Sequence, residues 1–124
     1  MVTWNEYLKG VFEKIIQSHH TISKLNDKPG DLRIIEKELL KITGFFNVVI
    51  RKLDSENFQS KNLSELKSKL SEYLDTYYFE KEIETMAPLY SEDSNRIRNL
   101  RLKILESFDD KKLIDRIQNI LEEL

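Results

Sequence analysis

The sequence predicts an all-α protein, an antiparallel bundle of four to five helices in a single domain of 124 residues. Three observations lead to this fold class. Apolar residues recur at alternating spacings of four and three, which is the period of an amphipathic helix. Glycine and proline, with three and two residues, give few of the turns that an all-β fold requires. No segment alternates apolar and polar residues with a period of two, as a half-buried strand would.

The first helix is expected to begin at once and to end before a loop at residues 26–31. Thr3 followed by Glu6 has the pattern of a capping box. The loop contains a proline and a glycine, which stop the helix, and Asp31 is expected to cap the next one. Two helices joined by so short a loop predict an antiparallel hairpin. The apolar stripe, with Ser18 as its one polar step, consists of Trp4, Leu8, Val11, Ile15, Ile22 and Leu25.

The second helix, residues 32–53, has the longest unbroken apolar period and is predicted to lie at the centre of the bundle. Ile34, Phe45 and Val48 point to roughly the opposite side from its main stripe, so this helix requires neighbours on both faces. The run at 45–50 could instead form a buried strand, but no other segment could pair with it. The main stripe consists of Ile35, Leu39, Ile42, Phe46, Val49 and Leu53.

The third helix is predicted to begin with a capping signature at Asn62 and Glu65. Its register drifts after Tyr77, where we expect a bend or a frayed turn, and a proline within 86–90 is expected to break it. Phe58, in the polar connection before this helix, is expected to fold back onto the bundle. The stripe consists of Leu63, Leu66, Leu70, Tyr73, Leu74 and Tyr77.

Two further helices are expected in the last third of the chain. Several residues within 91–94 could cap the fourth helix, and Asp109 could cap the fifth. The alternative is one continuous rod, but the polar step after Phe108 favours two helices. The apolar residues of the fourth helix are Ile97, Leu100, Ile104 and Phe108.

Few residues suggest chemistry. The chain has no cysteine, which excludes disulfides, thiolate catalysis and zinc–thiolate sites. His19 and His20 point about 100° apart on a helix and have no further ligand one turn away, so we expect one ring beside the apolar stripe and the other in solvent. Glu80 and Glu84 suggest an acidic surface, and no glycine-rich phosphate loop occurs. We predict a non-enzyme without catalytic, cofactor-binding or metal-binding residues.

The sequence also gives an expectation about location. No apolar run approaches the roughly 18 residues of a membrane span. Polar and charged residues interrupt the N-terminal segment, which a signal peptide would not allow. We therefore expect a soluble cytoplasmic protein with no membrane partner.

Charge is distributed unevenly along the chain. Residues 54–93 contain ten acids and four bases, a net charge of −6, whereas four bases and no acid follow within residues 94–103. A basic edge can contact the phosphates of a nucleic acid, and the alternative is intramolecular pairing with the acidic third helix. No aromatic residue that could stack on a base occurs within the basic run. The four bases are Arg96, Arg98, Arg101 and Lys103, with Lys111, Lys112 and Arg116 as possible extensions.

The C-terminal helix has more large aliphatic residues than one bundle needs. We call them the C-terminal cluster and predict a protein interface there, either a homodimer or a groove for a partner helix. The alternative is that they complete the core. The function predicted is a non-enzymatic interaction module or small subunit of a larger assembly, with a nucleic-acid-associated accessory protein as the alternative. The cluster consists of Leu113, Ile114, Ile117, Ile120, Leu121 and Leu124.

Overall fold

The computed structural model describes residues 4–55, 61–110 and 112–123, and it confirms the all-α prediction. Within these ranges the chain forms six helices and no strand, so the predicted number of four to five helices is wrong. The additional helix arises because the predicted third helix is two. The six are α1 (Trp4–Lys24), α2 (Asp31–Ser55), α3 (Lys61–Thr76), α4 (Phe79–Tyr90), α5 (Ser94–Asp110) and α6 (Leu113–Glu123).

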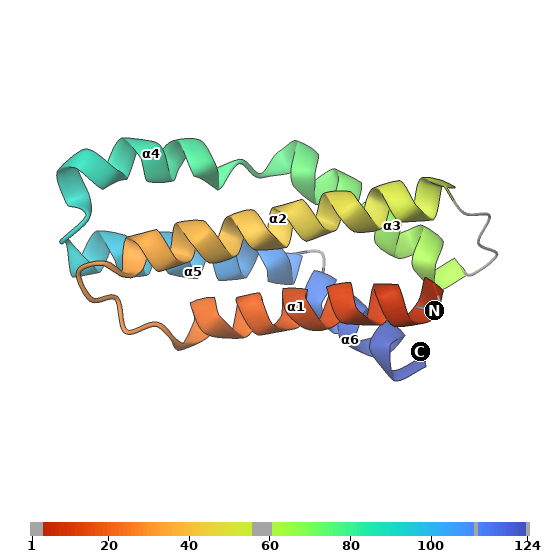
Figure 1. Cartoon of the computed structure of the whole chain (residues 1–124). Helices are drawn as coiled ribbons and strands as arrows, with labels where there is room; N and C mark the ends of the chain where they lie inside the picture. The colour runs from red at the N-terminus through yellow and green to blue at the C-terminus, as the bar shows by residue number, and fades with distance from the viewer. Residues whose placement is uncertain (1–3, 56–60, 111, 124) are drawn as a thin grey trace.

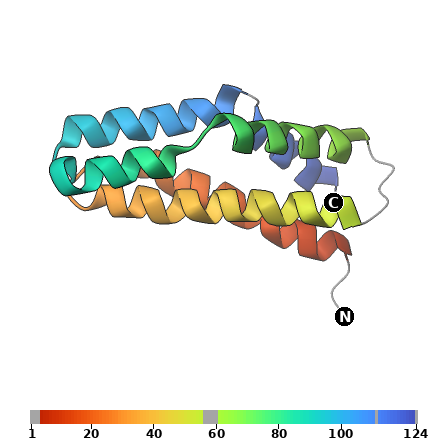
Figure 2. The ribbon, with the colours of Figure 1, turned by 90° about the horizontal axis from the view of Figure 1, so that it is seen from above.

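The helices form a bundle of four roughly antiparallel rods (Figure 1). α1 and α2 are one rod each, joined by the short loop that the sequence predicts. α3 and α4 follow one another along the third rod, and α6 continues at an angle from the end of α5 in the fourth (Figure 2). α2 contacts α1, α3, α4 and α5, which is the position expected of the central helix.

The main stripe of α2 is buried along its whole length. Phe46 has no exposed surface, and its ring packs edge-on against Tyr73 and Phe108, with centroids 5.5 and 6.0 Å away. This confirms its predicted place in the core. The strand alternative for residues 45–50 is wrong, because all of them lie within α2.

The third rod is interrupted between α3 and α4 at Tyr77 and Tyr78. The Tyr77 N–H donates to the Tyr73 carbonyl at 2.9 Å, and Tyr78 has an extended backbone with φ −143° and ψ 80°. The Tyr77 ring stacks on Phe79 across the interruption, with centroids 5.7 Å apart. The two residues reset the helical phase, so that Phe79 and Ile83 face the core. The register drift after Tyr77 is therefore a break and not a bend.

The third rod ends within the segment 86–90, as predicted, although at Tyr90 and not at the proline itself. α4 continues through Pro88, which lies in its last turn, and ends at Tyr90. A proline so close to the end removes one helical hydrogen bond but leaves little helix beyond it to disrupt. α5 is capped within 91–94 as expected, because Asp93 Oδ1 accepts from two backbone N–H groups of the first turn at 3.1 and 3.2 Å.

Other predicted caps differ from the structure. The Asn62 side chain donates to Glu123 of α6 instead of capping its own helix. Asp109 belongs to the last turn of α5, and the turn into α6 is made by Lys112 with φ +52°. α5 and α6 are separate helices, as the sequence favours. Four residues with predicted roles fall outside the described ranges: Thr3, Phe58, Lys111 and Leu124.

Candidate interaction surfaces

The described part of the C-terminal cluster lies mostly inside the bundle. α6 contacts α1, α3 and α5, and Leu121 is half-buried against the core. A partner would reach the buried residues only if α6 moved away, so little apolar area of α6 is exposed for a dimer. An interface at this cluster stays a prediction. The buried residues are Leu113, Ile114, Ile117 and Ile120.

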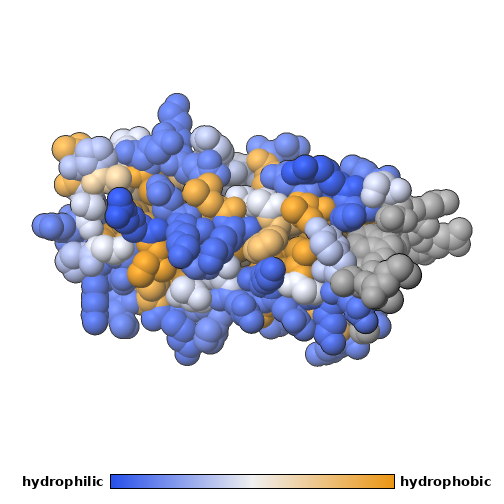
Figure 3. Space-filling view, viewed as in Figure 1, coloured by the Kyte–Doolittle hydropathy of each residue, from blue (hydrophilic) through white to orange (hydrophobic). Residues whose placement is uncertain are grey.

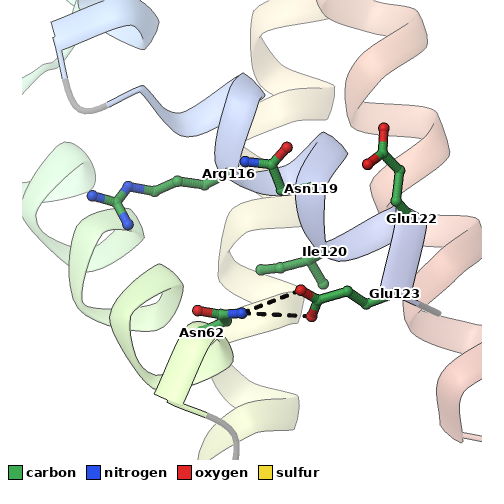
Figure 4. Close-up of a pocket in the computed structure, with 6 residues that line it drawn as sticks. All are labelled: Asn62, Arg116, Asn119, Ile120, Glu122 and Glu123. Atoms are coloured by element: carbon green, nitrogen blue, oxygen red, sulfur yellow. Dashed lines mark hydrogen bonds between the residues drawn. The ribbon is translucent and has the colours of Figure 1, made fainter.

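A polar crevice lies between α6 and the start of α3 (Figure 4). The Asn62 amide donates to the Glu123 carboxylate at 3.4 and 3.5 Å. Arg116 extends toward α3, where its guanidinium is 3.6 Å from Glu65. Contacts within the chain therefore cross the crevice, and we assign it no ligand. It has a volume of about 380 Å³ and is lined by Asn62, Arg116, Asn119, Ile120, Glu122 and Glu123.

Three of the four bases predicted for a nucleic-acid edge make exposed contacts on α5 or beside it. Lys103 binds the acidic α4, as the intramolecular alternative predicts. Arg96 and Arg98 instead contact residues that are close to them in the sequence. Exposed contacts of this kind contribute roughly 0–1 kcal/mol each and leave the charges accessible. The contacts are Arg96 over the Tyr90 ring (3.7 Å to the centroid), Arg98 to Asn95 Oδ1 (3.1 Å) and Lys103 to Glu82 Oε1 (3.0 Å).

Arg101, the fourth base, joins the α1–α2 loop to α5. Its Nε and Nη2 donate to the two Asp27 carboxylate oxygens at 2.7 and 3.1 Å, and both side chains are only 12% exposed. A third donor, Nη1, contacts the Ser23 carbonyl at 3.4 Å. The hydrogen bonds with Asp27 raise the pKa of Arg101. This guanidinium is bound by the loop, and a phosphate contact at Arg101 stays a prediction.

The same loop has local features that support this contact. Asp27 has φ +62°, a left-handed conformation that aspartate tolerates better than most residues. Asp31, expected to cap α2 with its side chain, instead accepts the Lys28 N–H at 3.0 Å and closes the loop. The loop is thus held both to itself and to α5.

A cleft of about 670 Å³ separates the first turns of α2 from the second half of α4. Its lining combines apolar side chains with charges of both signs, so it favours no particular ligand charge. The residues that determine this character are Leu32, Ile83, Ala87, Arg33, Glu36 and Glu92.

A groove between α1 and α2 is the surface that sequence reasoning missed. In α2 a second stripe with the same alternating spacing of four and three lies one residue before the core stripe. In α1 a stripe of that spacing shares Val11, Ser18 and the following Leu25 with the core stripe. The helices are antiparallel (Figure 1), so Lys52 near the end of α2 lies over Tyr7 near the start of α1, and Lys14 lies over Phe45. We define the α1–α2 groove by these two stripes: Tyr7, Val11, Lys14, Ser18, Thr21 and Leu25, and Ile34, Glu38, Lys41, Phe45, Val48 and Lys52.

Lysines and aromatic rings meet across the α1–α2 groove. Lys14 Nζ lies 5.9 Å from the Phe45 ring centroid, and Lys52 Nζ lies 5.1 Å from that of Tyr7. The Lys41 ammonium is 3.4 Å from the Glu38 carboxylate. A hollow of about 440 Å³ lies in the middle of the groove, between Lys14 and Lys41.

Apart from Val11, which is buried, the apolar residues of the α1–α2 groove are incompletely covered. Tyr7 is 41% and Ile34 38% exposed, and Phe45 and Val48 are half-buried. The sequence predicts that α2 needs neighbours on both faces. Its core face is fully covered, whereas its face in the α1–α2 groove is covered only in part. On this face of the bundle, apolar groups shown in orange alternate with polar groups shown in blue (Figure 3). Because lysines interrupt the second stripe, it does not form an unbroken apolar run in the sequence.

The two histidines follow the expected arrangement. His19 is half-buried, and its ring packs edge-on against Phe108 with centroids 5.8 Å apart, whereas His20 is exposed. Burial lowers the pKa of His19, the Asp109 charge raises it, and His20 lowers it again. Among the described residues, no three histidine or acidic side chains gather as metal ligands would.

No described helix combines the length and the apolar character that crossing a membrane requires. Comparison of the chain with protein-family models, with curated proteins and with solved structures finds no match in any of the three.

Proposed function

We propose that this chain is a non-enzymatic helical interaction module or a small subunit of a larger protein assembly, and that it binds through the α1–α2 groove. The observation behind this proposal is the unequal covering of α2. Packing within the chain buries one apolar face of α2 fully and leaves apolar side chains accessible on the other. Contiguous apolar groups that remain accessible are typical of contact surfaces.

The composition of the α1–α2 groove supports a protein partner. Interfaces between proteins combine aromatic and aliphatic residues at their centre with a polar rim. Phe45 and Val48 provide the apolar centre, and the lysines provide the rim. Lysine stems also pack along apolar surface while the ammonium stays in water, so these residues can widen the contact.

An affinity capture from cells of the source organism tests this proposal. The baits are the wild type, Phe45→Ser in the α1–α2 groove, and Leu102→Ser, which removes an exposed leucine on α5 as a matched control. We expect the same proteins with the wild type and Leu102→Ser, and their loss with Phe45→Ser. Circular dichroism confirms that each bait is folded. Recovery of the same proteins by all three baits, or of none above an empty resin, would contradict the proposal.

The nucleic-acid alternative has less support, because Arg101 is bound within the chain and the other three bases of α5 have neighbours of their own. It makes a distinct prediction. Binding of a short oligonucleotide should weaken steeply with salt and be lost in the Arg96→Ala, Arg98→Ala double variant. That result would make the nucleic-acid-associated role the main proposal and the interaction module its alternative.

A further inference from the structure

The charge of the α1–α2 groove indicates the chemistry of its partner, an inference that rests on the proposed function. Lys14, Lys41 and Lys52 occupy three of its twelve positions, all of which are described, and Glu38 is the one acid among them. The Glu38 side chain is only 12% exposed and already contacts Lys41. Neither Lys14 nor Lys52 pairs with an acid among the described residues. The accessible charge of the groove is therefore positive, which favours an anionic partner.

The shape of the α1–α2 groove suits a helix. The stripe from Ile34 to Lys52, which lies wholly within α2, is about 27 Å long at a rise of about 1.5 Å per residue, which a helix of five turns would match. Helices that lay an apolar face into such a groove are a recurrent mode of recognition. We propose that the groove binds an acidic amphipathic helix of a partner protein. The apolar stripe of that helix packs on Phe45 and Val48, and its carboxylates pair with the three lysines.

A second copy of this chain fits the α1–α2 groove less well. A symmetric dimer would place the same surface of both copies face to face. Its three lysines would then oppose the three lysines of the other copy, and like charges brought together at an interface are destabilising. The groove therefore favours a different chain over its own duplicate.

A nucleic acid also fits less well, although it is anionic. Binding of single strands relies on bases that stack on the faces of exposed aromatic rings. In the α1–α2 groove, Lys14 lies over the Phe45 ring and Lys52 over the Tyr7 ring. Each ring therefore already has an ammonium group of the chain over one face, which leaves less of that face for a base to stack on.

Fluorescence anisotropy with three labelled probes tests the proposal. The first is a synthetic amphipathic helix of about five turns with a leucine stripe flanked by glutamates. The second has lysines in place of the glutamates, and the third is a single-stranded oligodeoxythymidine. The proteins are the wild type, the Lys14→Glu, Lys41→Glu double variant, and a Lys9→Glu, Lys81→Glu control, which changes the net charge equally at exposed positions outside the groove.

We expect saturable binding of the acidic helix by the wild type and the control. The groove variant should bind it at least about tenfold more weakly, which corresponds to about 1.4 kcal/mol. Equal loss in both double variants, preference for the lysine peptide, or absence of acidic-helix binding would overturn the proposal. Oligonucleotide binding that only the groove variant loses would assign the groove to nucleic acid. A wild-type dimer that the groove variant dissolves in sedimentation equilibrium would assign it to a second copy.

The two proposals fail differently. If affinity capture depends on Phe45 but the acidic peptide does not bind, the interaction module stands and its partner has other chemistry. If affinity capture does not depend on Phe45, the groove is not the contact surface, and the inference about its partner fails with it.

Discussion

Two stripes of α2, displaced from each other by one residue, have the same spacing and opposite environments. The core stripe that ends in Leu53 is apolar at every position and buried throughout. The neighbouring stripe in the α1–α2 groove has a charged residue at three of its six positions and stays partly accessible. The spacing of each stripe predicts one face of a helix. The charged residues show which of the two faces stays accessible to a partner and which packs within the chain.

The difference between the stripes also has an energetic meaning. A buried face contributes to stability through the apolar area that it removes from water, at roughly 25 cal/mol per Å². A face with accessible lysines gains less on folding, because part of its apolar surface stays in water. That remaining surface is what a partner can still cover. Stability should therefore depend mainly on the core stripe, and binding mainly on the groove.

The largest expected effect comes from substituting two adjacent phenylalanines, one in each stripe. Phe46→Ala should lower the free energy of unfolding by roughly 3 to 5 kcal/mol, because it leaves a cavity beside Tyr73 and Phe108. Phe45→Ala should lower it by no more than about 1.5 kcal/mol, because Phe45 is half-buried. Urea denaturation of both variants measures the difference. Equal shifts of the midpoint would show that the two stripes do not differ in burial.

The next effect concerns the contact that joins the α1–α2 loop to α5. Arg101→Ala should lower the free energy of unfolding by about 3 kcal/mol, because it leaves the Asp27 carboxylate nearly buried without its cation. Arg98→Ala, at an exposed position of the same helix, should change it by no more than about 0.5 kcal/mol. Thermal denaturation separates the two. A loss for Arg98→Ala as large as for Arg101→Ala would refute the special role of the loop contact.

The fold class was largely predictable from sequence because each core stripe repeats regularly. The stripe of α2 alone is sufficient to predict a long central helix, and Phe46 is buried as expected. The interruption at Tyr77 and Tyr78 was not predictable as a break. A change in helical phase looks the same in sequence whether the helix bends or stops, and the outcome depends on tertiary contacts such as the stacking of Tyr77 on Phe79.

Surface residues were harder to predict, because their roles depend on which helices become neighbours. Arg101 and Asp27 are far apart in the chain, and no local pattern relates them. The burial of the C-terminal cluster likewise depends on how α6 packs against α1 and α3. The α1–α2 groove did have a local signal, the repeat through Phe45 and Val48, but the intervening lysines resembled an ordinary solvated face.

A smaller effect is expected at Gly44, an exposed position of α2 that belongs to neither stripe. A Cβ placed there meets no atom within 4 Å, so Gly44→Ala should raise the free energy of unfolding by roughly 0.5 to 1 kcal/mol. Gly30→Ala is the contrasting control, because its φ of +95° strains any side chain and should make that variant less stable. Circular dichroism during urea denaturation measures both. Destabilisation by Gly44→Ala would mean that α2 tolerates no added volume at this position.

The smallest effect concerns α1, where His19 packs against Phe108 and the adjacent His20 is exposed. Burial lowers the pKa of His19 below its ordinary value of 6.5, so below that pH the unfolded chain binds a proton that the folded chain does not. The stabilisation from this histidine is therefore complete above pH 6.5 and decreases as the pH falls toward the lowered value. NMR titration should find the pKa of His19 below 6.5, and His19→Gln should reduce the loss of stability on mild acidification, whereas His20→Gln should not. A His19 pKa at or above 6.5 would show that burial against Phe108 does not outweigh the charge of Asp109.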